Sequence, residues 1–392
     1  MQIAANINTG TDETELSGLG VLQVLPRLNM GGAERSAVDI ALAVARAGGR
    51  SFVASAGGDM TRELERAGVR HLALPLASKN PFRIRANGGR LADLVRQQGI
   101  DIVHARSRAP AWSARHAARS AGAHFITTVH GVYGEGSAFK RRYNRVMAEG
   151  ERVIANSEFV ARHLRAAYGL EDGRLVTIPR GIDEQYFDPA RVRGDRMADL
   201  ARRWRLPDGA MIVLMPGRVS RRKGQRHLIE ALARLDRPDL LAVILGSSGE
   251  HRSYARELLE LVRARGMEGR VRLVEDCPDM PAAYMLADVV VSAADKPEAF
   301  GRVLVEAQAM GRPVIATDHG GARETVLAGQ TGWLLPPGDV AALAATIAEA
   351  LALDTETRLA VAEAARHHVL EHYTLARMNG ATLRLYRSLA GR

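Results

Sequence analysis

The chain of 392 residues contains a single cysteine, Cys277. One cysteine excludes an internal disulfide and a cysteine-based zinc cluster, and it fits a reducing compartment. No apolar run approaches the ~18 residues that a membrane-spanning helix needs. Residues 1–19 are polar and acidic, unlike a signal peptide, and we expect them to form a flexible tail. These absences predict a cytoplasmic protein.

Lysine is also scarce, with four residues, so arginine supplies nearly all of the excess that gives a net charge of +10. Two stretches carry much of this charge: Lys79–Arg119, with nine basic residues against two acidic ones, and Lys140–Arg145. Such clusters attract anionic surfaces, for example lipid headgroups or phosphorylated glycolipids. No nucleic-acid-binding motif accompanies the charge, so nucleic acid is not an expected partner. The alternative is a solvated basic face without a partner.

A chain of this length is expected to form two domains. Strand and helix patterns alternate along both halves, which predicts parallel sheets with helices on both faces. The alternation lapses at residues 186–208 into glycine, aspartate, proline and charged residues, and we place a linker there. The predicted fold is α/β, with Rossmann-like doubly wound domains at residues 20–185 and 209–372 that face a cleft. Residues 373–392 form a C-terminal helix that could pack back on the first domain.

Two carboxylates stand eight positions apart in the stretch Lys296–Ala307, which follows the apolar strand pattern Val289–Ser292. Glu298 is expected in the loop at the C-terminal end of this strand, and Glu306 inside the helix that follows. Open α/β sheets bind ligands beyond their C-terminal strand ends, and a helix N-terminus offers N–H groups to phosphate. A carboxylate on the helix can accept hydrogen bonds from two sugar hydroxyls. This stretch is therefore the candidate active centre; the alternative is a surface acid beside a helix-face acid.

A basic loop with glycine, Gly217–Gly224, follows another strand pattern and contains Arg218 and Lys223. An arginine fork and a lysine point charge together can hold a diphosphate and offset the charge that develops on a leaving group. We therefore expect both side chains to take part in catalysis.

Gly31 and Gly32 open a predicted helix in the first half, where glycine lets the backbone approach a ligand closely. A plain tight turn is the alternative. The pattern is not GxGxxG, which disfavours a nicotinamide enzyme. His130 ends a strand pattern, and His104 holds a similar position where a structural histidine is as good an interpretation. No group of histidine and acidic residues has convincing metal-ligand spacing, so no metal is expected.

Several fragments occur in an order and spacing that resemble the retaining glycosyltransferases of family 4, which have the two-Rossmann-domain GT-B fold. The resemblance extends over about residues 20 to 385. The fragments are Gly31–Glu34, His130-Gly131, Pro179–Asp183, Met215–Arg218, Lys223-Gly224, Leu245-Gly246, Ala287-Asp288, Glu298–Glu306, Met310–Ala316, Gly320-Gly321 and Glu324. Arg180 stands where relatives often have asparagine, so no role is transferred to it.

The resemblance implies roles for these residues. Glu306 would bind the ribose of the donor nucleotide, Glu298 would lie beside the transferred sugar, and His130 would contact that sugar. The implied catalytic residues are Arg218, Lys223, Glu298 and His130. The implied nucleotide-sugar site consists of Gly31, Gly32, Arg218, Lys223, Gly246, Glu298, Phe300, Gly301, Val303, Leu304 and Glu306. The donor would be UDP- or GDP-linked, and neither a metal nor a separate cofactor is implied.

The resemblance predicts a retaining transferase that moves a hexose from a nucleoside diphosphate sugar to a glycolipid, lipopolysaccharide or polysaccharide acceptor. The acceptor would bind the first domain, and the basic clusters would hold the protein on the inner face of a bacterial cytoplasmic membrane. The alternatives are another enzyme of this fold, such as a nucleotide-sugar epimerase or a phosphorylase, and a non-catalytic membrane-associated scaffold.

Overall fold

The computed structural model describes residues 15–29, 31–134, 136–235 and 237–391. The chain divides into two compact units, one of Met1–Gly181 with Leu375–Arg392 and the other of Ile182–Thr374. Most of the expected tail, residues 1–14, lies outside the described residues. Leu16 and Leu19 are 2% and 1% exposed and belong to the core of the first unit, so this unit includes residues before the expected boundary at residue 20. No helix in the described part of the chain is long and apolar enough to cross a membrane.

The first unit contains a parallel sheet of seven strands in the order β3-β2-β1-β4-β5-β6-β7. Its strands are β1 (Gly20–Val24), β2 (Arg50–Ser55), β3 (Arg70–Ala73), β4 (Ile102–Ala105), β5 (His124–Val129), β6 (Arg152–Ala155) and β7 (Leu175–Thr177). Leu22 of β1 lies between Phe52 of β2 and Val103 of β4, and all three side chains are buried. The strand order reverses between β1 and β4, and this is the edge where doubly wound sheets bind ligands.

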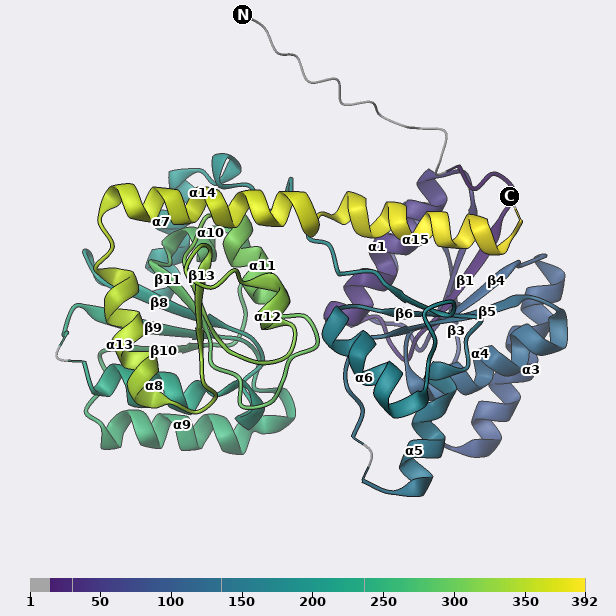
Figure 1. Ribbon diagram of the computed structural model, residues 1–392, viewed down its shortest axis with the longest axis horizontal. Coiled ribbons are helices and arrows are strands. Elements are labelled where there is room, and N and C mark those ends of the chain that lie inside the picture. Colours follow the sequence, from purple (N-terminus) through teal and green to yellow (C-terminus); the bar gives the residue numbers. More distant parts are fainter. Residues whose placement is uncertain (1–14, 30, 135, 236, 392) are drawn as a thin grey trace, which may run out of the picture. The chain divides into compact units, whose positions relative to one another are not determined.

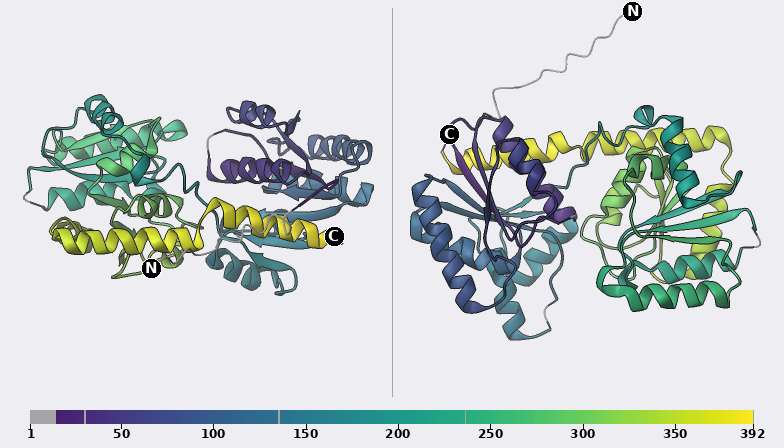
Figure 2. Two further views of the ribbon diagram at one scale, coloured as in Figure 1. Left: turned by 90° about the horizontal axis from the view of Figure 1, so that it is seen from above. Right: turned by 180° about the vertical axis from the view of Figure 1, so that it is seen from behind.

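Helices cover both faces of this sheet (Figures 1 and 2). They are α1 (Gly32–Arg46), α2 (Thr61–Arg66), α3 (Pro81–Gln97), α4 (Arg108–Ala121), α5 (Ala138–Arg145), α6 (Glu158–Tyr168) and α15 (Leu375–Leu389), with a 3₁₀ turn at Val146–Ala148. The last helix, α15, lies beside α1 and contributes Met378, Leu383 and Tyr386 to the core of the unit (Figure 1). The chain end is therefore part of the first unit.

The second unit contains a parallel sheet of six strands in the order β10-β9-β8-β11-β12-β13. Its strands are β8 (Met211–Pro216), β9 (Leu240–Leu245), β10 (Val271–Val274), β11 (Val289–Ser292), β12 (Val314–Thr317) and β13 (Gly332–Leu335). Its helices are α7 (Gly194–Trp204), α8 (Gln225–Ala233), α9 (Arg252–Ala264), α10 (Met280–Leu286), α11 (Arg302–Ala309), α12 (Ala322–Thr325), α13 (Val340–Leu351) and α14 (Thr355–His372). Short 3₁₀ turns occur at Pro189–Arg191, Arg221–Lys223 and Gly249–His251. The strand order reverses between β8 and β11. The predicted α/β class, with two Rossmann-like parallel sheets, is confirmed.

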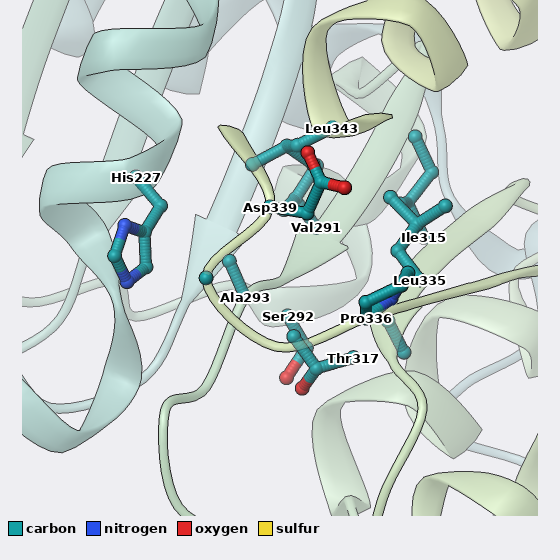
Figure 3. Close-up of a pocket in the computed structure, with 12 residues that line it drawn as sticks. His227, Val291, Ser292, Ala293, Ile315, Thr317, Leu335, Pro336, Asp339 and Leu343 are labelled. Carbon is teal, nitrogen blue, oxygen red and sulfur yellow. The ribbon is translucent and has the colours of Figure 1, made fainter. Parts of the chain in front are cut away.

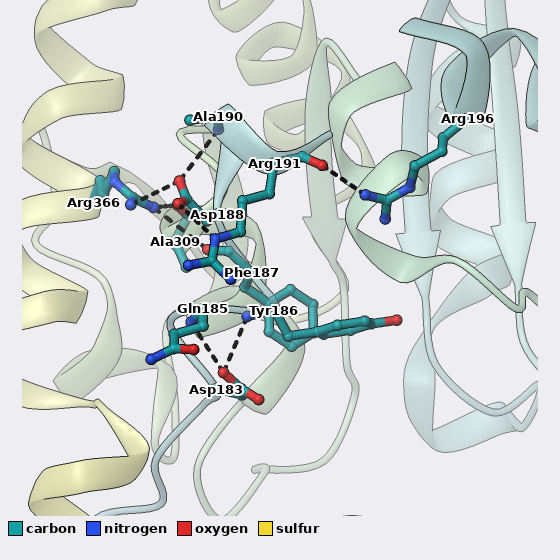
Figure 4. A network of polar contacts seen from close by, with 10 residues as sticks. All are labelled: Asp183, Gln185, Tyr186, Phe187, Asp188, Ala190, Arg191, Arg196, Ala309 and Arg366. Carbon is teal, nitrogen blue, oxygen red and sulfur yellow. Dashed lines mark hydrogen bonds and ion pairs between the residues drawn. The ribbon is translucent and has the colours of Figure 1, made fainter. Parts of the chain in front are cut away.

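The expected linker at residues 186–208 needs correction, because this stretch folds as part of the second unit. Leu200 and Trp204 of α7 are buried in the core of that unit. Figure 4 shows how the charged residues hold the preceding turn, with Arg366 of α14 donating to Asp188 at 3.1 Å. Arg196 donates to both carboxylate oxygens of the α10 cap, Asp279, at 2.7 Å each. The charged residues that made this stretch resemble a linker therefore attach it to the second unit.

Candidate functional site

The candidate residues of the second unit lie in the loops that follow β8, β9 and β11 and on α11, at the C-terminal edge of the sheet. The ammonium of Lys223 forms a close ion pair with the Oε1 atom of Glu298, and each of the two side chains is 23% exposed. The aliphatic end of Lys223 lies over Gly217, 3.4 Å from where a Cβ on that glycine would stand. The structure thus brings a predicted cation and a predicted carboxylate into direct contact.

Glycines allow four loops to pack in two pairs at this edge. Gly246, after β9, has a φ of +152°, and a Cβ there would stand 2.3 Å from the carbonyl oxygen of Gly217. Gly320, after β12, has a φ of +62°, and a Cβ would stand 2.4 Å from the carbonyl oxygen of Glu298. Any side chain at either position would push the loops apart. Gly246 therefore contributes through its backbone, by fixing the start of the Arg218 loop.

The side chain of Arg218 is exposed. Its carbonyl oxygen accepts a hydrogen bond from Gln225 at 3.0 Å, which fixes the backbone. Within the part of the chain that the structure describes, the guanidinium makes no ion pair. An exposed, unbalanced guanidinium on a fixed loop can bind an anion without first losing a partner.

The start of α11 offers backbone donors next to the Lys223–Glu298 pair. Gly301 has a φ of +85° and precedes the helix, and within the described residues no acceptor meets the N–H groups of Gly301, Arg302 and Val303. Leu304 differs, because its N–H donates to the carbonyl of Gly301 at 2.9 Å. The side chains of Phe300 and Leu304 are buried, so at these positions only the backbone faces a ligand. Free N–H groups at a helix start favour a phosphate or carboxylate oxygen.

Glu306 is 6% exposed, and both of its oxygens already accept hydrogen bonds. Tyr284 of α10 donates its hydroxyl to Oε2 at 2.8 Å, and Arg302, one helical turn earlier, donates to Oε1 at 2.6 Å. Burial, and then the negative charge of Glu306, raise the pKa of Tyr284 well above its usual value, so the tyrosine stays a donor. Each carboxylate oxygen retains one further lone pair for a ligand hydroxyl.

Neither Tyr284 nor Arg302 was among the predicted site residues. Arg302 had a signal in the sequence, because a cation four positions before a glutamate pairs with it on a helix. Tyr284 had none, because its contact with Glu306 depends on how α10 packs beside α11.

In the first unit, the predicted His130 and Gly32 lie on either side of Arg180, the residue to which no role had been transferred. One Nη of Arg180 donates to Nδ1 of His130 at 3.1 Å. A Cβ on Gly32 would stand 2.7 Å from the other Nη, so glycine at this position makes room for the guanidinium. Gly31 caps the start of α1 in extended conformation, with φ −175°. The substitution of arginine for the family's asparagine therefore adds a cation to this edge.

His130 is held in its neutral form. Burial lowers its pKa well below the usual value, and the charges of Arg180 and Arg106 lower it further. Because Nδ1 accepts from Arg180, the ring proton resides on Nε2, which is buried and has no partner among the described residues. A neutral imidazole with a free N–H can donate a hydrogen bond to an oxygen of a ligand.

His104 has a structural role. It is fully buried, with Nδ1 2.6 Å from the hydroxyl of Tyr386 on α15 and Nε2 2.7 Å from the hydroxyl of Thr128 on β5. Both ring nitrogens are satisfied inside the protein. Of the two interpretations for this strand-end histidine, the structural one is correct.

A small cavity lies at the C-terminal ends of β11, β12 and β13 (Figure 3). Its lining includes His227, Ser292, Thr317 and Asp339, and the space open to the centre of a water molecule is about 10 Å³. This volume corresponds to roughly one water molecule. The cavity is too small for a substrate. Among the described residues, no group of three or more histidine, cysteine or acidic side chains is arranged to hold a metal ion.

Two family models match the chain in succession. The model described as Glycosyltransferase Family 4 matches residues 30–186, and the model described as Glycosyl transferases group 1 matches residues 197–368. A glycosyltransferase structure from Rickettsia africae is 35% identical, with a TM-score of 0.89, and the alignment covers 95% of this chain and 99% of that one. Together with the two parallel doubly wound sheets, these matches identify a glycosyltransferase of the GT-B fold. The chain belongs to glycosyltransferase family 4, as its motifs predicted.

Two further relatives have descriptions that name substrates. A Catenulispora acidiphila protein named D-inositol 3-phosphate glycosyltransferase 1 is 35% identical over 286 residues, which cover 67% of each chain. The structure of Anabaena HepE in complex with UDP and glucose is 24% identical, with a TM-score of 0.83 and coverage of 95% of this chain and 100% of that one. At this identity, the second likeness is one of fold.

Proposed function

We propose that this glycosyltransferase moves a hexose, with retention of configuration, from a nucleoside diphosphate sugar to a hydroxyl of a glycolipid, lipopolysaccharide or polysaccharide acceptor. The Lys223–Glu298 ion pair beside the free N–H groups of α11 is the observation that carries this proposal. It joins a phosphate-binding cation, a sugar-binding carboxylate and a helix start at one edge of the sheet. The relative that binds UDP and glucose supports a UDP-linked donor, although GDP suits the same contacts.

The donor's diphosphate would lie on Arg218, Lys223 and the first N–H groups of α11. Its negative charge competes with Glu298 for Lys223, so binding would release the carboxylate toward the sugar. Glu306 would accept from the ribose hydroxyls while Tyr284 and Arg302 hold it in place. In the first unit, the free N–H of neutral His130 would donate to the transferred sugar.

Transfer breaks the bond between the anomeric carbon and the β-phosphate oxygen and forms a bond to the acceptor oxygen. The charge that develops on the departing phosphate is offset by Arg218 and Lys223. No carboxylate or histidine of the candidate site is placed as a free base, and the leaving phosphate itself would take the proton of the acceptor hydroxyl. This proposal needs no metal ion and no separate cofactor.

The acceptor would lie at the surface of a membrane. Two aromatic side chains of the first unit, Phe82 on α3 and Phe139 on α5, are 82% and 81% exposed, and each is followed by basic residues. Exposed aromatics among cations favour a peripheral position on an anionic leaflet. We therefore propose a cytoplasmic enzyme at the inner face of the membrane.

A thermal-shift panel of UDP, GDP and ADP, followed by their sugars, tests the donor. We expect one nucleoside diphosphate to raise the melting temperature of the wild type and to lose this effect in Arg218→Ala and Lys223→Ala. Arg263→Ala, an exposed arginine on α9, is the control and should respond as the wild type does. Incubation with donor alone, and then with acceptor, separates transfer from epimerisation. A panel in which no nucleotide raises the melting temperature would favour the scaffold.

A further inference from the structure

A groove on the first unit lies apart from the residues that are proposed to bind the donor. It is formed by the first half of α4, by α5 and by the end of α6, and its volume is about 1030 Å³. This is large enough for a ligand of substrate size, since such pockets have ~300–1,000 Å³. The side chains that define the basic groove are Trp112, Arg115, Arg141, Arg142, Arg145 and Tyr168.

The charge of the basic groove is unbalanced. One carboxylate, Glu149, lines it, and Arg115 holds that carboxylate in a close ion pair. Helix α5 has no acidic side chain to offset its own cations. In the described part of the chain, Arg142 and Arg145 have no carboxylate partner. Arg142 and Arg145 therefore give a concave site an excess of positive charge.

The aromatic wall of the basic groove is fixed before any ligand arrives. The indole N–H of Trp112 donates to the carbonyl of Tyr143 at 3.3 Å, and the two rings stack with centroids 6.5 Å apart. The guanidinium of Arg115 lies 4.6 Å from the centre of the indole ring. A side chain held in this way costs little ordering entropy when a ligand binds.

The chemistry of the basic groove selects its ligand. Guanidinium groups match phosphate oxygens with paired hydrogen bonds, which a lysine ammonium cannot do. Flat aromatic faces offer apolar area to a sugar ring and retain polar edges. A flat bilayer surface meets exposed side chains such as Phe139, whereas Trp112 and Arg115 line a recess that a headgroup has to enter. The combination fits a carbohydrate that bears a phosphate or diphosphate.

We propose that the basic groove binds the phosphorylated end of the acceptor, a diphosphate-bearing carbohydrate. This inference rests on the proposed function, because it assigns to the first unit the acceptor of the same reaction. Arg142 and Arg145 of α5 supply the charge for a diphosphate, and Trp112 and Tyr168 supply the surface for the adjoining sugar. The diphosphate could be free in solution or could end a polyprenyl chain.

Calorimetric titration of the full-length protein with inorganic diphosphate tests the basic groove. The titration is made in an Arg218→Ala/Lys223→Ala background, so that the proposed donor site does not take up the probe. Arg142→Ala/Arg145→Ala should weaken binding at least about tenfold, because each substitution removes charge-assisted hydrogen bonds. Arg62→Ala/Arg66→Ala, on α2, removes the same charge from the same unit and should leave the dissociation constant within about twofold, since the charge lies outside the groove.

Vesicles separate the two sources of the diphosphate. Phosphatidylcholine vesicles with a polyprenyl diphosphate are compared with vesicles that carry phosphatidylglycerol at equal charge. If the parent protein binds the polyprenyl diphosphate vesicles and Arg142→Ala/Arg145→Ala does not, the acceptor is lipid-linked. If the parent protein binds only free diphosphate, the acceptor is soluble. The inference is overturned if neither diphosphate binds, if the groove variant binds as tightly as its parent, or if both kinds of vesicle bind equally. UDP binding by the otherwise wild-type protein is measured separately, so a failed donor site and a failed groove give different results.

Discussion

The two units share one architecture but manage charge in opposite ways. In the second unit, Lys223 is already paired with Glu298 and Arg302 with Glu306, whereas Arg218 makes no ion pair with a described residue. In the first unit, His130 is neutral between arginines, and the basic groove has an excess of positive charge. A ligand that binds Lys223 in the second unit has to displace Glu298, whereas a ligand of the basic groove neutralises unpaired charge. The difference fits a donor that binds and dissociates in each catalytic cycle, and an acceptor whose phosphate is attracted by the basic groove.

The largest effect is expected at the paired cation of the second unit. Lys223→Ala should lower kcat by about 100- to 1000-fold, which is the usual loss when a group that stabilises developing charge is removed. Steady-state kinetics with the donor identified by thermal shift measures this. Arg263→Ala is the matched control on the same unit. A Lys223→Ala enzyme that folds and turns over at the wild-type rate would show that the pair is structural.

The next effect is expected at Glu306. Glu306→Ala leaves Arg302 and the Tyr284 hydroxyl without their buried acceptor, and should lower the free energy of unfolding by about 3 kcal/mol. Tyr284→Phe retains the carboxylate and should cost about 1–2 kcal/mol. Denaturant unfolding gives both values. The KM for the donor separates binding from stability: it should rise in the more conservative Glu306→Gln, and an unchanged KM would contradict a role in ribose binding.

A smaller effect is expected where the C-terminal helix is anchored on the first unit. Tyr386→Phe removes the hydroxyl that meets His104 and should lower the free energy of unfolding by about 1–3 kcal/mol, because buried polar atoms lose a partner. Ser388→Ala, on the exposed side of the same helix, should change it by less than about 0.5 kcal/mol. Equal effects of the two substitutions would show that Tyr386 is not an anchor.

The smallest effect concerns pH. Burial lowers the pKa of His130 below the unfolded value of 6.5, so below that pH the unfolded chain binds the proton first. The contribution of His130 to the free energy of unfolding is therefore fully present above about pH 6.5, and it decreases as the pH is lowered toward the pKa of the folded state. At pH 5.5 the expected decrease is about 1.4 kcal/mol. The free energy of unfolding of His130→Gln should fall less between pH 7.5 and 5.5 than that of the wild type. Parallel curves would mean that His130 titrates normally.

Much of the fold follows from the sequence, because apolar strand runs and helical spacing depend on local chemistry. The loops that contain Lys223 and Glu298 were located from the strands that precede them. Their mutual contact was not predictable, because it depends on glycines that let neighbouring loops touch. The linker was assigned wrongly because composition outweighed the apolar spacing of Leu200 and Trp204, which lie one helical turn apart on a buried face.

The role of Arg180 and the existence of the basic groove lie beyond sequence reasoning for a different reason. Arg180 departs from the family pattern, and its contact with His130 links positions fifty residues apart. The groove joins three helices whose charges are visible in the sequence but whose concave arrangement is not. In both cases the missing information is the packing of elements that are distant along the chain.

The central claim is that the C-terminal edge of the second unit binds a nucleoside diphosphate through Arg218 and Lys223. Calorimetric titration of the full-length protein with UDP, and with GDP, tests it most directly. We predict one binding event in the wild type and in Arg263→Ala, and its loss in Arg218→Ala/Lys223→Ala. Nucleotide binding of equal affinity in all three proteins, or no binding in any of them, would contradict the assignment.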